Sequence, residues 1–95
     1  MNVKEVKSHL IDDLKSALVQ LMDAENKGDE ADVERFKKHS LEIAERMIRI
    51  CDIELNKEPK KKSLLNERTL FSEIYNALEE EEYLELNKLL KKLKP

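Results

Sequence analysis

The sequence predicts an all-α protein, an antiparallel up-down bundle of three long helices followed by a short C-terminal fourth helix. One glycine and two prolines occur in 95 residues, whereas the turns of a sheet favour both residue types. The chain is rich in Leu, Glu, Lys and Ile, and apolar residues recur at the three- and four-residue steps of amphipathic helices. This length predicts a single domain, 1–95, with one modest core.

The first helix is expected from about Asn2 to Glu25. Its apolar stripe comprises Val3, Val6, Leu10, Leu14, Ala17, Leu18 and Leu21. The stretch "NKGD" should end it, because Gly28 can adopt the left-handed conformation common at helix C-termini. Asp29 then predicts the N-cap of the next helix.

The second helix is expected from about Glu30 to Leu55, with an apolar arc that covers about half of its surface. Its central stripe comprises Val33, Phe36, Ser40, Ile43, Ala44, Met47, Ile50 and Cys51. An arc this broad predicts packing against at least two neighbours, and therefore a central position in the bundle.

An exposed interhelical linker is expected at 56–63. Pro59 cannot lie inside a helix, and it disfavours helical geometry at Glu58. Ser63 is the expected N-cap of the following helix, with Asn66 as an alternative.

The last third, 64–93, can be read as one helix or two. If the helix continued, carboxylates would occupy the next positions on the face formed by Leu70, Phe71, Ile74 and Leu78. The next apolar set points about a quarter-turn away. Because carboxylates are rarely buried without partners, a break near 80–82 and a short fourth helix are favoured. No glycine or proline marks that break.

Four lysines, Lys57, Lys60, Lys61 and Lys62, lie in the predicted linker. The favoured interpretation is a solvated link between helices. The alternative is a nucleic-acid-binding regulator that contacts phosphates through this lysine loop. The net charge of −3 and the absence of interleaved aromatic residues make nucleic acid the less favoured partner.

No residue pattern predicts a catalytic site, a cofactor or a metal. His9 and His39 have carboxylates three or four residues later, but the order is the reverse of the Glu-x-x-His of bundle metal sites, and surface histidines are expected. Cys51, the single cysteine, faces the core stripe and is expected to be packed and inert. The protein is therefore expected not to be an enzyme.

Apolar helix surface exceeds what a bundle of this size is expected to cover, which favours protein–protein contact. The expected partner is an amphipathic helix of another protein, or a second copy in a homodimer. The expected partner-binding residues lie in the C-terminal third: Phe71, Ile74, Tyr75, Tyr83, Leu86 and Leu90.

No apolar run is long enough to span a membrane, and the N-terminus lacks the apolar segment of a signal peptide. With one cysteine, an intrachain disulfide cannot form. A cytoplasmic protein without membrane contact is expected.

Two segments, "AENKGDEADVERFKKHSLEIAERMI" and "LFSEIYNAL", resemble flagellar export chaperones, small helical bundles that hold flagellar subunits before secretion. The second segment is similar to a Leu-x-x-Leu-Tyr pattern of the flagellin-specific members. The chain lacks the extra N-terminal segment of those members, so flagellin itself is not implied. The resemblance implies binding of an amphipathic client helix, with Phe71, Ile74 and Tyr75 at the matching positions.

Overall fold

The computed structural model describes residues 2–93, and within them the chain forms four α-helices and no strand. They are α1 (Val3–Lys27), α2 (Glu30–Lys57), α3 (Lys62–Glu79) and α4 (Tyr83–Lys92). The all-helical fold is confirmed, as is the division of the last third into two helices. The molecule measures 44 × 25 × 18 Å.

The cap between α1 and α2 was predicted correctly. Gly28 is left-handed, with φ of 72°, and its N–H donates to the carbonyl of Glu25 while the N–H of Asp29 donates to that of Ala24. This hydrogen-bond pair is a Schellman motif, which satisfies the last carbonyls of a helix. The Asp29 carboxylate accepts from the N–H of Asp32 at 3.1 Å and caps α2.

The second link is shorter than predicted, because α2 extends to Lys57 and α3 begins at Lys62. The expectation that Ser63 or Asn66 caps α3 is wrong. The N-cap is Lys61, whose side chain makes no capping hydrogen bond, and Ser63 lies in the first turn. Leu64, in the first turn of α3, is the first buried core residue of this helix.

The break between α3 and α4 falls at Glu80–Glu82, where the sequence predicted it. Glu81 is left-handed with φ of 55°. Its N–H donates to the carbonyl of Leu78, and that of Glu82 donates to Ala77 at 2.9 Å. This is a second Schellman motif, with glutamate where α1 uses glycine.

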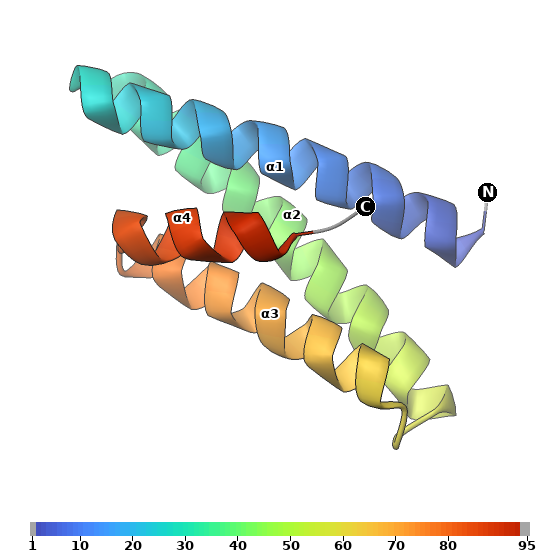
Figure 1. Cartoon of the computed structure of the whole chain (residues 1–95). Coiled ribbons are helices and arrows are strands. Elements are labelled where there is room, and N and C mark those ends of the chain that lie inside the picture. The colour runs from blue at the N-terminus through green and yellow to red at the C-terminus, as the bar shows by residue number, and fades with distance from the viewer. Residues whose placement is uncertain (1, 94–95) are drawn as a thin grey trace.

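Helix α2 packs against both α1 and α3, as its broad apolar arc predicted. Figure 1 shows α2 behind α1 and α3, with α4 in front between them. Helix α4 contacts α3 more closely than α1, and the backbones of α1 and α3 do not approach each other closely. The core lies among the four helices, and its fully buried large side chains include Leu14, Leu18, Leu21, Met47, Phe71, Ile74, Leu78, Leu86 and Leu89.

Within the described residues, no helix combines the length and the apolar character that crossing a membrane requires.

Candidate interaction groove

A groove with a volume of about 490 Å³ lies between the C-terminal half of α1 and helix α4. It is lined by Val19, Met22, Asp23, Glu25, Asn26, Tyr83, Leu84, Asn87 and Leu90. The groove exists because α4 packs closely on α3 and only loosely on α1.

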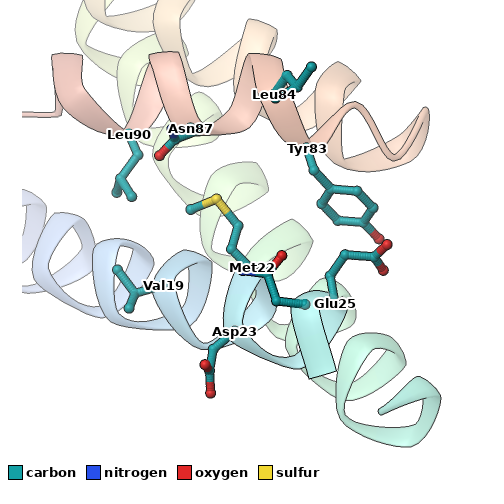
Figure 2. A pocket seen from close by; sticks show the side chains of 9 residues that line it. Val19, Met22, Asp23, Glu25, Tyr83, Leu84, Asn87 and Leu90 are labelled. Carbon is teal, nitrogen blue, oxygen red and sulfur yellow. The ribbon is translucent and has the colours of Figure 1, made fainter. Parts of the chain in front are cut away.

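The floor of the groove is apolar. Figure 2 shows Val19 and Met22 pointing from α1 toward α4, and Leu90 and Tyr83 pointing from α4 toward α1. Val19 is 55% exposed although it is apolar. These side chains belong to helices that face each other without filling the space between them.

The walls of the groove combine an apolar edge with an acidic one. Leu84 points away from α1 at the outer edge of α4 in Figure 2, and it is 84% exposed. Asp23 lies on the outer side of α1 and pairs with Lys27 at 3.0 Å. Exposure of this leucine to water is unfavourable, because each Å² of apolar surface left in water costs about 25 cal/mol.

The groove continues into an acidic hollow at the same end of the molecule. Glu25 and Tyr83 line both spaces, and the hollow is completed by Gly28, Glu30, Val33, Glu34 and Glu81. Figure 2 shows Glu25 reaching up beside the Tyr83 ring. Burial, followed by the Glu81 and Glu25 carboxylates, raises the pKa of Tyr83. The phenol therefore lies partly buried beside the carboxylates of Glu25 and Glu81.

A second hollow, of about 390 Å³, lies at the opposite end of α1. There Lys7 reaches from α1 to Glu54 of α2 and to Glu67 of α3, the latter at 2.7 Å. Burial of the ammonium opposes its charge, but hydrogen bonds to both carboxylates outweigh that effect and raise the pKa of Lys7. This ion cluster joins three helices.

Cys51 lies beside this ion cluster and is fully buried, as predicted. Its Sγ donates to Oε1 of Glu67 at 3.7 Å. Burial, followed by the charge of Glu67, raises the pKa of the thiol to about 11. Because the thiolate is the reactive form, this environment suppresses nucleophilic chemistry at neutral pH.

The predicted partner-binding residues do not form one accessible surface. Phe71, Ile74 and Leu86 are at most 1% exposed and belong to the core, so in this conformation a partner cannot reach them. Tyr75, Tyr83 and Leu90 are half-buried. The apolar stripe that predicted these residues is largely covered by the bundle itself.

Of the six predicted residues, only Tyr83 and Leu90 line the groove. Val19, Met22 and Leu84 were not predicted as partner-binding residues. The signal for two of them was present in the sequence, because Val19 and Leu84 are apolar but lie off the stripes that form the core.

The other candidate residues are placed apart from the groove. His9 and His39 are both exposed, as expected of surface histidines. Lys57, Lys60, Lys61 and Lys62 are exposed at the α2–α3 link, and Lys61 pairs with Glu58 at 3.4 Å.

Comparisons with protein-family models, with curated proteins and with solved structures gave no match to this chain.

Proposed function

We propose that the protein acts without catalysis, by binding an amphipathic helix of a protein partner in the α1–α4 groove. The observation that carries the proposal is the unfilled apolar floor formed by Val19, Met22 and Leu90, with exposed Leu84 beside it. Helix-in-groove recognition uses such a surface, in which apolar residues of the bound helix replace water against apolar walls.

The dimensions of the groove suit about two helical turns. Tyr83 and Leu90 lie seven residues apart on α4, which corresponds to about 10 Å along the helix axis. Val19 and Asn26 have the same spacing on α1. A partner helix would then contribute about three apolar residues, at positions i, i+3 or i+4, and i+7.

The resemblance to flagellar export chaperones supports the same class of partner, an amphipathic client helix. We propose a role as an adaptor, an export chaperone or a small regulator in the cytoplasm. We also propose the finer architecture expected from the sequence, an antiparallel up-down bundle, because the three links of two to four residues join helices that pack against each other.

The test uses a blocked 20-residue peptide in which a leucine stripe at three- and four-residue steps is set in alanine and glutamine. Titration into ¹⁵N-labelled protein should shift backbone amide resonances in the second half of α1 and in α4. The double variant Val19→Ala/Leu84→Ala should weaken binding about 5- to 30-fold, since truncating each of the two apolar contacts costs about 0.5–1 kcal/mol.

The matched control is Ile53→Ala/Leu65→Ala, which removes two exposed apolar side chains outside the groove. It should leave the affinity unchanged. No binding of the peptide, or shifts centred on α2 and α3, would refute the proposed function.

A second copy of the chain is the alternative occupant. Sedimentation across the micromolar range distinguishes the two, because a homodimer through the groove would dissociate in the Val19→Ala/Leu84→Ala variant and would compete with the peptide.

A further inference from the structure

The two regions that frame the acidic hollow and the adjoining end of the groove carry a large excess of negative charge. Residues 22–36 and 76–87 contain eleven carboxylates and two cations, a net charge of 2 − 11 = −9. The whole chain has a net charge of −3, so the remaining 68 residues have −3 + 9 = +6. The chain is thus strongly polarised, with its acidic part around the hollow and the end of the groove that adjoins it.

Most of this acidic charge around the hollow has no counter-ion. Among the described residues, Glu25, Glu30 and Glu34 make no ion pair, and all three are exposed. Only Glu81, of the carboxylates in the hollow, is paired, with Lys37 at 2.9 Å. An unneutralised acidic hollow attracts cations and disfavours anions.

The apolar groove and the acidic hollow are continuous, since Glu25 and Tyr83 line both. A helix lying in the groove would therefore project one of its ends into the hollow. There the Glu25, Glu30 and Glu34 carboxylates would face the first or last turn of that helix.

We propose that the partner helix is basic at one end: a short apolar stripe for the groove, joined to a cluster of Lys or Arg for the acidic hollow. This inference rests on the proposed function and specifies the chemistry of its partner. Charge complementarity at the edge of an apolar contact selects among partners and speeds their association.

The test compares four blocked peptides that share one leucine stripe. One is neutral, two carry three lysines at the N- or the C-terminal end, and one carries three glutamates. At low ionic strength, one of the lysine peptides should bind about 10-fold tighter than the neutral peptide, and the glutamate peptide about 10-fold weaker, as expected for three exposed ion pairs. The preferred lysine end gives the orientation.

The matched variants separate local from general attraction. Glu25→Gln/Glu30→Gln/Glu34→Gln should abolish the preference, so that the lysine and neutral peptides bind this variant with equal affinity. Asp12→Asn/Asp13→Asn/Glu42→Gln removes three exposed carboxylates outside the groove and the hollow, and should preserve most of the preference. Circular dichroism confirms that both variants are folded.

The outcomes are distinguishable. If the neutral and lysine peptides bind equally, or if both triple variants reduce the preference equally, the inference of a basic partner is overturned while the proposed function stands. If no peptide binds, the proposed function itself fails. A lysine peptide with a scrambled leucine stripe should not bind. If it still binds, the interaction depends on charge alone and the inference is overturned.

Discussion

The hollow around Lys7 and the acidic hollow around Glu25 lie beside opposite ends of α1. They are similar in size but opposite in electrostatic character. At the N-terminal end, Lys7 lies between Glu54 and Glu67, so the charges of three helices offset one another. At the C-terminal end, Glu25, Glu30 and Glu34 have no ionic partners among the described residues, and they adjoin an apolar groove. The first arrangement stabilises the fold, whereas the second leaves both charge and apolar surface exposed to solvent.

Both hollows have the same structural origin. The backbones of α1 and α3 do not approach each other closely, so side chains or another helix must fill the space between them. At one end a single long side chain, Lys7, does so. At the other end helix α4 is inserted, and its buried leucines face the core while Leu84 and Leu90 line the groove.

Removing the anchor of α4 should have the largest effect on stability. Leu86 is fully buried, and Leu86→Ala should lower the free energy of unfolding by about 2–5 kcal/mol through lost burial and a cavity. Leu84→Ala, two residues away on the same helix, should change it by less than about 0.5 kcal/mol. Urea titration monitored by circular dichroism measures both; equal losses would mean that α4 does not pack as described.

Breaking the ion cluster at the other end should have the next largest effect. Lys7→Met leaves the Glu54 and Glu67 carboxylates facing each other without a cation, and should cost about 1–3 kcal/mol at pH 7. The control Lys27→Met breaks an exposed pair with Asp23, which water and salt screen, and should have no measurable effect on stability.

The pH dependence of the Lys7 effect has a definite sign. Since the folded state raises the pKa of Lys7, its contribution is complete below the ordinary lysine value and is lost as the pH rises through the folded value. The difference between the wild type and Lys7→Met should therefore shrink in strongly alkaline solution. A constant difference at every pH would mean that the ammonium charge is not what stabilises the fold.

Cys51 should add a second alkaline transition of smaller size. Its thiol pKa rises from 9.0 to about 11 on folding, so between these values the unfolded chain has lost a proton that the folded chain retains. Stability should fall over that range by about 1–2 kcal/mol. Urea titrations at pH 8 and pH 11 should show this fall in the wild type and a smaller one in Cys51→Ala; equal falls would refute it.

The two Schellman motifs should respond in opposite directions to substitution, with the smallest effects. Gly28→Ala forces a side chain into the left-handed region and should cost about 1 kcal/mol, with no steric clash because nothing lies within 4 Å of the added Cβ. Glu81→Gly relieves the same strain and should stabilise by about 0.5 kcal/mol, after loss of the exposed Lys37 pair.

The control for Glu81 is its neighbour. Glu80 has φ of −88°, so Glu80→Gly relieves no strain and should destabilise by about 0.5–1 kcal/mol. Thermal unfolding followed at 222 nm ranks the three variants. If Glu81→Gly is as destabilising as Glu80→Gly, the left-handed residue does not carry strain.

The sequence by itself determined the helices, because their cause is local. The helical spacing of apolar residues and the scarcity of turn residues are properties of short segments. So is the Gly28–Asp29 signal, and the structure confirms the link between α1 and α2 that it predicted. Even the break at Glu80–Glu82 followed from a local conflict, since a continuous helix would have buried carboxylates. The left-handed residue, Glu81, had no such signal, because glutamate has no intrinsic preference for that conformation.

Only the tertiary structure decided which apolar surface stays open. An apolar stripe predicts that Phe71, Ile74 and Leu86 are buried. It does not say whether the same chain or a partner buries them, and here the bundle itself does so. Likewise, the packing of four helices of unequal length sets the separation between α1 and α3. The groove at Val19 and Leu84 therefore also depends on that packing. Burial is a property of the whole packed assembly, whereas helix formation is largely a property of each segment.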